Sequence, residues 1–364
     1  MTTIQELIHK IRLRGLQRLK NKTHAKNSKE YVSAWLEKDV LIPGKVENVL
    51  VVILRTHGCS WARSEMGGCA MCGYINDCLS QDSKITTEDI IIQFSKAMNK
   101  FQNKKFQFVK IFTSGSFIDD NEVSKAAQKR ILEMCNELSL ENVLFESRPE
   151  FVTHEKLGEL TKIFNGKLQV AIGLESANNK ILKFAINKGF EFEDYCKAAK
   201  IAHALDIKIK TYLLLKPPFL TERDAISDAL NSINLLKKHT ATDIISINPI
   251  NIQKFTLVEH LFTRSEYRPP WLWSVVEILN QGAELLDGKN IRLLSQPTAA
   301  GLRKGAHNCG SCDKEVISAI NDFSLSGNTE VLQNPNLDCT CKEKWRDTLE
   351  LENMAKSILF KFPD

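Results

Sequence analysis

The sequence predicts a parallel α/β fold. Six apolar runs rich in β-branched residues alternate along the chain with segments of helical periodicity. Several runs are almost continuously apolar, such as VLVVIL and TYLLL, as expected for strands buried on both faces of a parallel sheet. The 364 residues, 43% hydrophobic and 26% charged, suffice for one α/β barrel with additions or for roughly two to three ordinary domains. A doubly wound sheet and a partial barrel both give this alternation, so the pattern alone leaves the two open.

The expected elements follow in a regular order. Strands are expected at Asn48–Thr56, Phe106–Ser116, Asn142–Arg148, Leu168–Ser176, Ile207–Lys216 and Asp243–Asn251. Helices are expected at Thr87–Phe101, Asn121–Leu138, His154–Phe164, Asn178–Ile186, Glu193–Leu205 and Thr221–Lys237. In both architectures the functional loops lie at the carboxyl ends of the strands. The loops there contain polar residues, glycine and proline, in the sequences TSGS, ESRPE, GLES, KPP and NPIN.

A basic segment precedes the first of these strands. Between His9 and Lys29 the chain has eight basic residues and no acidic one, and apolar residues recur at mostly helical spacing. We therefore expect a basic amphipathic helix and a polar linker within an N-terminal extension, residues 1–44. The helix could be a solvated face docked on the main body, or it could contact nucleic-acid phosphates, in agreement with the net charge of +5. An anionic membrane surface fits less well, because the apolar face is small and lacks tryptophan and phenylalanine.

Three cysteines after the first strand form the most informative motif. Cys59, Cys69 and Cys72 have the spacing C-x9-C-x2-C in the segment RTHGCSWARSEMGGCAMCGY. Three thiolates can hold three irons of a [4Fe–4S] cube and leave the fourth iron open. An open iron is a place for chemistry, whereas a fully ligated cluster only stores or moves electrons. The motif therefore points to catalysis.

A second group of cysteines lies towards the other end of the chain. Cys309 and Cys312 form a C-x2-C pair, and Cys339 and Cys341 form a C-x-C pair. Four thiolates in two such pairs favour a structural zinc site that contributes folding energy. A second iron–sulfur cluster and unliganded thiols stay open as alternatives, and His307 is an alternative ligand. The other cysteines are expected to be ordinary thiols: Cys78, Cys135 and Cys196.

The composition argues against membrane-spanning and secreted proteins. No apolar run approaches the roughly 20 residues that span a bilayer, and the first residues lack the apolar region of a secretory signal. Ten cysteines in such a chain favour metal binding or catalysis over disulfides. We expect a cytoplasmic protein.

Several motifs together resemble a known family. The segment HGCSWARSEMGGCAMCGY with TSGS, ESRPE and GLES resembles the radical S-adenosylmethionine (SAM) superfamily over about residues 45–255. ESRPE is similar to the elongator-catalytic-subunit-like branch, whose cysteines are also widely spaced. TSGSFID, LLLKPPF and the cysteine-rich tail resemble the radical-subunit family of archaeosine synthases. The resemblance implies a partial (β/α)6 TIM-like barrel at 45–255. We expect residues 256–364 to form a helical, cysteine-rich region that contains the zinc site inferred from the cysteine spacing.

The resemblance also implies roles for individual residues. Cys59, Cys69 and Cys72 would ligate the [4Fe–4S] cluster, whose open iron binds SAM. Glu175 would bind the ribose hydroxyls, and Arg148 would bind the cofactor carboxylate. The backbone of the TSGS segment would bind the methionine amino group, where the family usually has Gly-Gly-Glu. The remaining SAM-binding residues implied are Met71, against adenine, and Ser114, Gly115 and Ser116 of the TSGS segment.

The implied reaction is a tRNA modification. Cleavage of SAM by one electron would give methionine and a 5′-deoxyadenosyl radical, which takes a hydrogen atom from the substrate. In this family a partner subunit attaches lysine to 7-cyano-7-deazaguanine in tRNA, and the radical subunit cleaves the lysine C–N bond to form archaeosine. The implied partners are tRNA, the lysine-transferring subunit and an electron donor such as ferredoxin or flavodoxin.

Two other functions stay open. One is another tRNA-modifying radical enzyme, of the carboxymethylating elongator type or the methylthiolating type. The sequence offers no obvious acetyltransferase domain and no auxiliary cysteine triad before the barrel, which counts against both types. The second is a non-catalytic, cluster-bearing protein that binds RNA or serves as a scaffold. The open-iron triad counts against that function.

Overall fold

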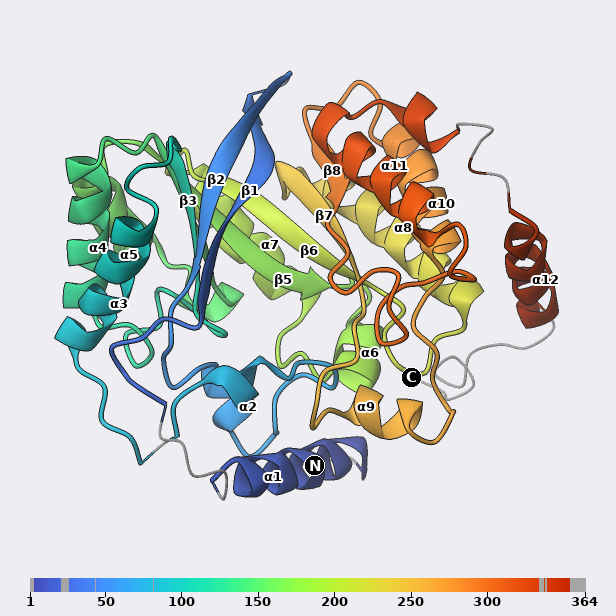
Figure 1. The fold of residues 1–364 in the computed structure, drawn as a ribbon, viewed down its shortest axis with the longest axis horizontal. Coiled ribbons are helices and arrows are strands. Elements are labelled where there is room, and N and C mark those ends of the chain that lie inside the picture. Colours follow the sequence, from blue (N-terminus) through green and yellow to red (C-terminus); the bar gives the residue numbers. More distant parts are fainter. Residues whose placement is uncertain are drawn as a thin grey trace. The chain divides into compact units, whose positions relative to one another are not determined.

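Strands and helices alternate through the computed structural model, which describes residues 3–20, 26–42, 44–80, 82–333, 337 and 339–353 (Figure 1). The strands are β1 (Ser33–Ile42), β2 (Lys45–Ile53), β3 (Phe108–Phe112), β4 (Asn142–Glu146), β5 (Lys167–Glu175), β6 (Lys208–Leu215), β7 (Ile244–Pro249) and β8 (Arg292–Ser295). The six expected strands are confirmed as β2 to β7.

The helices of the first half mostly follow the expected positions. They are α1 (Thr3–Lys20), α2 (Ser60–Arg63), η1 (Tyr74–Asp77), α3 (Thr87–Lys100), α4 (Lys125–Glu137), η2 (Pro149–Phe151) and α5 (His154–Ile163). The basic helix expected near the start of the chain is confirmed as α1. The polar linker expected after it falls partly on residues 21–25, which lie outside the described residues.

The second half adds further helices around the later strands. They are α6 (Asn179–Ile181), η3 (Leu182–Ile186), α7 (Phe192–His203), α8 (Glu222–His239), α9 (Leu257–Phe262), α10 (Leu272–Leu285), α11 (Asp313–Ser326), η4 (Thr329–Leu332) and α12 (Cys341–Asn353). The expected helix at 178–186 is instead one α-helical turn, α6, that continues as the π-helical turn η3.

The strand order distinguishes between the two architectures that the sequence left open. The strands of the sheet follow chain order, from β1 to β8. Pairing is parallel from β2 through β5 and again between β7 and β8, for example Val51 beside Lys110 and Lys110 beside Leu144. A doubly wound sheet reverses its strand order at a switch point, whereas a (β/α) barrel winds in one direction. The winding is therefore that of a partial barrel, as expected.

Two strands were not expected from the sequence. Residues 33–42, which we placed in the helical extension, form β1, which pairs antiparallel with β2. Its sequence SAWLEKDVLI mixes charged and apolar residues, because β1 lies at the edge of the sheet and is only partly buried. Strand β8 is only four residues long, RLLS, and is too short for its periodicity to be recognised.

Polar residues at the helix starts explain where several helices begin. Thr86 and Asp89 form a reciprocal capping box at the first turn of α3. A serine or threonine side chain accepts a backbone N–H in the same way at four other helices. These residues are Ser124, Thr153, Thr221 and Thr256.

The chain divides into two compact units. The first contains residues 1–68, 72–173 and 194–210, and the second contains residues 69–71, 174–193 and 211–364. In the first unit, helices α3, α4 and α5 lie together on one side of β3 (Figure 1). In the second unit, α10 packs against α8, α11 and β8. Within the described residues, none of the helices has the length and apolarity needed to cross a membrane.

Candidate active site

The cysteine loop, which we define as residues 54–80, follows β2 at its carboxyl end. Cys59 precedes α2 as its N-cap residue, and Cys72 lies two residues before η1. Both thiols are partly buried, and neither is part of a disulfide. Cys69, also partly buried, belongs to the second unit through residues 69–71. The loop thus presents the thiols that the sequence predicted, at the end of the strand where function was expected.

A buried carboxylate, Glu122, joins this loop to the TSGS loop after β3. Its Oε1 accepts the hydroxyl proton of Thr56 at 2.8 Å, and its Oε2 accepts the backbone N–H of Ser116 at 2.6 Å. The hydroxyl of Thr56 accepts the backbone N–H of Gly58 at 2.9 Å. Burial raises the pKa of Glu122 to about 7, although these hydrogen bonds favour the charged form. Sequence reasoning missed Glu122, because nothing in the segment FIDDNE distinguishes it from the neighbouring acids.

Gly115 lies where the two loops come closest. A Cβ atom on Gly115 would lie 2.8 Å from the Cα of Cys59 and would overlap Oε2 of Glu122. The preceding residue, Ser114, has a left-handed backbone with φ of +71°. Such a backbone is uncommon for a residue with a side chain, and it is typical of functional loops. The TSGS segment is therefore shaped by its contact with the cysteine loop.

The predicted cofactor residue Arg148 is held from two sides. Its backbone N–H donates to the hydroxyl of Ser116 at 2.9 Å, which links the loop after β4 to the TSGS loop. Its guanidinium donates to the carboxylate of Glu150 and lies 5.4 Å from the ring centre of Trp61. Trp61, in α2 of the cysteine loop, was not expected at the site. Arg148 is almost completely buried, so its orientation is well defined.

In the second unit, Glu175 ends β5 with an unusual backbone. Its φ is +71°, and its carboxylate forms an ion pair with Lys188 at 2.9 Å. The next residues are held by α8: the hydroxyl of Ser176 donates to Asp228 at 2.8 Å. The backbone N–H of Ala177 donates to the hydroxyl of Ser232 at 2.9 Å. These contacts fix the turn that carries Glu175.

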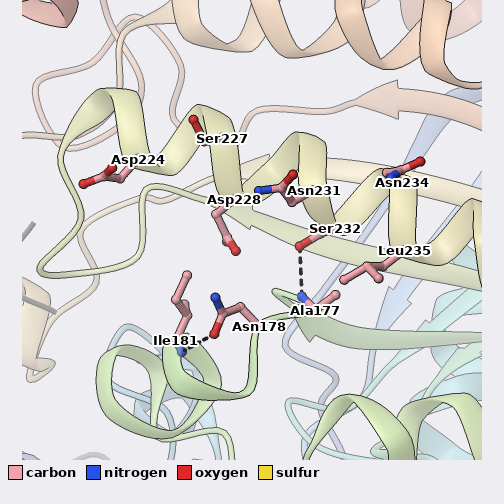
Figure 2. Close-up of a pocket in the computed structure, with 10 residues that line it drawn as sticks. All are labelled: Ala177, Asn178, Ile181, Asp224, Ser227, Asp228, Asn231, Ser232, Asn234 and Leu235. Atoms are coloured by element: carbon pink, nitrogen blue, oxygen red, sulfur yellow. Dashed lines mark hydrogen bonds between the residues drawn. The ribbon is translucent and has the colours of Figure 1, made fainter. Parts of the chain in front are cut away.

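A cavity of about 560 Å³ adjoins this turn. Figure 2 shows Asp228 of α8 pointing towards the segment that contains Ala177 and Asn178. Burial raises the pKa of Asp228 to about 7, and the hydrogen bond from Ser176 opposes that shift. Asn178 is already used as the cap of α6, since it accepts the backbone N–H of Lys180 and of Ile181. The cavity therefore contains the groups that support Glu175.

Met71 also lies in the second unit, where it packs against an apolar cluster. The members of the cluster are Leu214, Ile250, Ile252, Val258 and Tyr267. The neighbouring Ala70 is fixed through its backbone: its N–H donates to the carbonyl of Ile186 at 2.8 Å, and its carbonyl accepts from Leu257 at 3.0 Å. The predicted contact of Met71 with adenine stays a prediction.

The four cysteines of the tail come together in the second unit. Their sulfur atoms all lie within 4.8 Å of one another, although Cys309 and Cys341 are 32 residues apart in the chain. The Sγ of Cys309 lies 3.9 Å from that of Cys312 and 3.7 Å from that of Cys339, and the sulfurs of Cys312 and Cys341 are 3.6 Å apart. The two pairs therefore lie together, and the zinc site that their spacing favours stays a prediction.

Neighbouring groups orient the tail sulfurs. The indole N–H of the buried Trp273 donates to Sγ of Cys341 at 3.3 Å, and the amide of Asn308 donates to Sγ of Cys312 at 3.5 Å. Backbone N–H groups, with that of Cys312 contributing most, lower the pKa of Cys309 to about 6, which favours its thiolate. His307, the alternative ligand, is outside this group, and its Nδ1 faces the carbonyl oxygen of Gly305 at 2.8 Å.

A comparison with solved structures agrees with this fold. The structure resembles archaeal Elp3 from Methanocaldococcus infernus with a TM-score of 0.50 and 16% sequence identity, over 65% of this chain and 59% of that chain. No family model matches the chain. The likeness shows that this chain shares its fold with archaeal Elp3, and the motif of Cys59, Cys69 and Cys72 is the one that resembles radical SAM enzymes.

Sequence comparison is more specific. The chain is 41% identical to archaeosine synthase subunit beta of Methanosarcina acetivorans over 341 residues, which cover 93% of this chain and 95% of that protein. It is 40% identical to archaeosine synthase subunit beta of Thermococcus kodakarensis over 321 residues, 87% of this chain and 96% of that protein. The chain belongs to the archaeosine synthase subunit beta family. The name of these relatives marks each of them as one subunit of an assembly.

Proposed function

We propose that this chain is the radical-forming subunit that completes archaeosine in tRNA. The observation that carries the proposal is its 41% identity to an archaeosine synthase subunit beta over almost the whole of both chains. The substrate is a 7-deazaguanine in tRNA that carries lysine on its former nitrile. Removal of a hydrogen atom from the lysine side chain would start cleavage of its C–N bond, which leaves the formamidine of archaeosine on the base. The lysine is delivered by a partner subunit.

Cys59, Cys69 and Cys72 would hold a [4Fe–4S] cluster with one open iron. The donor set fits this group, because three partly buried thiols lie in one loop and none of them is in a disulfide. The nearby Cys78 is unsuited to be a fourth ligand. Burial, with a smaller effect from Glu122, raises the pKa of its thiol to about 12, and it packs against Ala62 and Ile75. When bound, the cluster supplies the electron that cleaves SAM.

Residues around the cysteine loop would position the cofactor. Gly115 lets the TSGS backbone approach Cys59, so that carbonyl oxygens of this loop would accept hydrogen bonds from an amino group bound beside the cluster. Arg148 would neutralise the cofactor carboxylate, and Glu175 would accept hydrogen bonds from ribose hydroxyls. Met71 would pack on adenine. Ser114 and Ser116 complete the loop. The hydroxyl of Ser116 already accepts the backbone N–H of Arg148.

The four tail cysteines would hold one structural zinc ion. A tetrahedral zinc with Zn–S bonds of about 2.3 Å places its sulfurs about 3.8 Å apart, close to the 3.6, 3.7 and 3.9 Å found for three of the pairs. Thiolates on four different irons of a cube lie further apart, because each sulfur extends from its own corner. We expect about one zinc and about four irons per chain after anaerobic purification. An iron content that corresponds to two clusters, with no zinc, would contradict this proposal.

The remaining partners follow from charge and chemistry. The net charge of +5 and exposed basic side chains such as Lys10 of α1 support tRNA as the substrate. Reduction of the cluster needs a one-electron donor of low potential, such as ferredoxin or flavodoxin. Both requirements agree with a cytoplasmic enzyme.

Mass spectrometry of tRNA nucleosides tests the proposed function. Lysine-modified tRNA, prepared with the partner subunit, is incubated anaerobically with this chain, reductant and SAM. We expect the lysine adduct to disappear and archaeosine to appear in equal amount. Cofactor cleavage with an unchanged lysine adduct would instead favour the second candidate, a radical SAM enzyme that modifies another tRNA position.

A further inference from the structure

Helix α1 contacts the cysteine loop through a buried arginine. The side chain of Arg12 is buried, with 3% of its surface exposed. Its Nε donates to the carbonyl oxygen of Gly67 at 3.1 Å, and its Nη2 donates to the carbonyl oxygen of Cys72 at 2.6 Å. Both carbonyls belong to the cysteine loop, and Cys72 is itself a predicted ligand. The guanidinium therefore reaches the backbone of a ligand residue from a helix more than fifty residues away in sequence.

The backbones of the helix and the loop also touch directly. A Cβ atom on Gly67 would lie 2.9 Å from the Cα of His9, and Gly67 has a φ of +74°. Leu16 of α1 and Cys59 both pack against the apolar cluster of Ala62, Ile75 and Cys78. Ile8 is also buried. Helix α1 is thus packed tightly on the loop.

Two further positively charged side chains donate hydrogen bonds to other carbonyl oxygens of the same loop. Lys26 donates to the carbonyl of Asn76 and, at 3.1 Å, to that of Cys78. Arg55 donates to the carbonyl of Asp77 at 2.6 Å and to that of Glu30 at 3.1 Å. Hydrogen bonds from a charged donor are about twice as strong as neutral ones. The loop is therefore held in place by positive charge.

We propose that Arg12 is a positioning residue for the iron–sulfur cluster. It holds the loop backbone at Gly67 and Cys72, and its buried positive charge favours the reduced cluster. The proposal rests on the proposed function, because it takes Cys59, Cys69 and Cys72 to be the cluster ligands. Reduction adds one negative charge, and a positive charge stabilises that state most where burial limits screening by water.

The basic residues of α1 lie in two different environments, one buried against the cysteine loop and one exposed to solvent. Because Arg12 is buried against the loop, it is unavailable to tRNA phosphates. The exposed charges of α1, including Arg14, point to solvent. Arg14 therefore serves as a control for Arg12, because both are arginines of the same helix and only Arg12 is buried.

The test compares Arg12→Ala, Arg12→Lys and Arg14→Ala with the unmodified protein, without SAM or tRNA. The first measurement is the midpoint potential of the reconstituted cluster, followed by its EPR signal. We expect Arg12→Ala to shift the potential to a more negative value. Arg12→Lys keeps the charge and should stay close to the unmodified protein, and Arg14→Ala should match it.

The second measurement needs no cluster. Trypsin cleavage after Arg63, in the cysteine loop, is timed in the metal-free chain. Loss of two charged hydrogen bonds should speed this cleavage by roughly tenfold or more in Arg12→Ala, and partly in Arg12→Lys. Arg14→Ala should cleave at the unmodified rate.

The outcomes distinguish this proposal from the proposed function. An Arg12→Ala protein with the potential and cleavage rate of Arg14→Ala would overturn the role of Arg12 while leaving the cluster assignment intact. An unmodified chain that takes up no iron would overturn the cluster assignment itself, and the trypsin measurement would still decide whether Arg12 positions the loop. If circular dichroism shows that Arg12→Ala is unfolded, an unchanged cleavage rate in Arg12→Lys would overturn the proposal.

Discussion

Two buried carboxylates support the loops of the site, and neither is predicted to touch a cofactor. Glu122 joins the TSGS loop to the cysteine loop, and Asp228 holds the turn after Glu175. Burial raises the pKa of both carboxyls to about 7. Groups with such shifts often gather around functional sites. At the scale of single residues, hydrogen bonds and close contacts hold the loops that carry the proposed cofactor-binding residues.

The close approach at Gly115 gives the first prediction. In Gly115→Ala the new methyl group would overlap Glu122 and press on the backbone of Cys59. We expect SAM cleavage to fall by roughly tenfold or more, since a shift of about 1 Å in a site can cost a hundredfold. The rate of 5′-deoxyadenosine formation measures this effect.

Gly158→Ala is the matched control, because nothing lies within 4 Å of a Cβ at this position of α5. It should keep the unmodified rate, and alanine in a helix should raise the free energy of unfolding by about 1 kcal/mol. Equal rates in the two alanine variants would contradict the role given to Gly115.

Asp228 gives a prediction about pH. Its folded pKa of about 7 is above the ordinary value of 3.8, so the folded state holds a proton that the unfolded chain has released between these values. The stability of the folded state therefore falls as pH rises from about 4 to about 7, by at most about 1.4 kcal/mol per pH unit from this group. Asp228→Asn removes this loss and keeps an acceptor for Ser176. Its stability relative to the unmodified protein should rise between pH 5 and pH 7 in urea unfolding. A pH-independent difference would argue against the buried, protonated carboxyl.

At the scale of elements, the edge strand β1 supplies the acidic partners of a lysine that is buried in the sheet. Lys110 of β3 is 1% exposed and forms ion pairs with Glu37, at 2.6 Å, and with Asp39, both from β1. A lysine in such a strand is tolerated only when it is paired. The pairing also shows that β1 is an integral part of the first unit.

Breaking this pairing should be costly. Lys110→Met removes the positive charge that pairs with the buried Asp39, and we expect the free energy of unfolding to fall by about 3–5 kcal/mol. Lys129→Met, which removes an exposed lysine paired with Glu133 in α4, should change it by less than about 0.5 kcal/mol. Chemical denaturation of both variants measures the difference. Similar losses in the two variants would contradict the account of β1.

The features that could be predicted from the sequence are those with a local pattern. Strands β2 to β7 were predicted because their apolar runs are long, whereas β1 and β8 lack that signal. The cysteines of both groups were found because their spacing is itself the signal. Glu122, Trp273 and Arg12 were missed as site residues, because their roles come from partners distant in the sequence. A lone acid, tryptophan or arginine has no local pattern that reveals such a partner.

At the scale of the whole molecule, we propose different roles for the two cysteine groups. The first lies at the end of β2, where a barrel presents its reactive loops. The second is a compact group of four sulfurs held by Trp273 and Asn308 in the second unit. The division of the chain at residues 44 and 255 into an extension, a barrel and a tail stays a prediction. One group would carry the reaction, and the other would stabilise the fold.

The formation of 5′-deoxyadenosine tests the central claim most directly. The anaerobically reconstituted protein is incubated with dithionite and SAM, with and without lysine-modified tRNA, and the nucleoside is measured by mass spectrometry. We expect 5′-deoxyadenosine from the unmodified protein and none from Cys59→Ala, while Cys135→Ser, a change far from the loop in sequence, retains the activity. The same yield from the unmodified protein and from Cys59→Ala would contradict the claim that the cysteine loop is the catalytic centre.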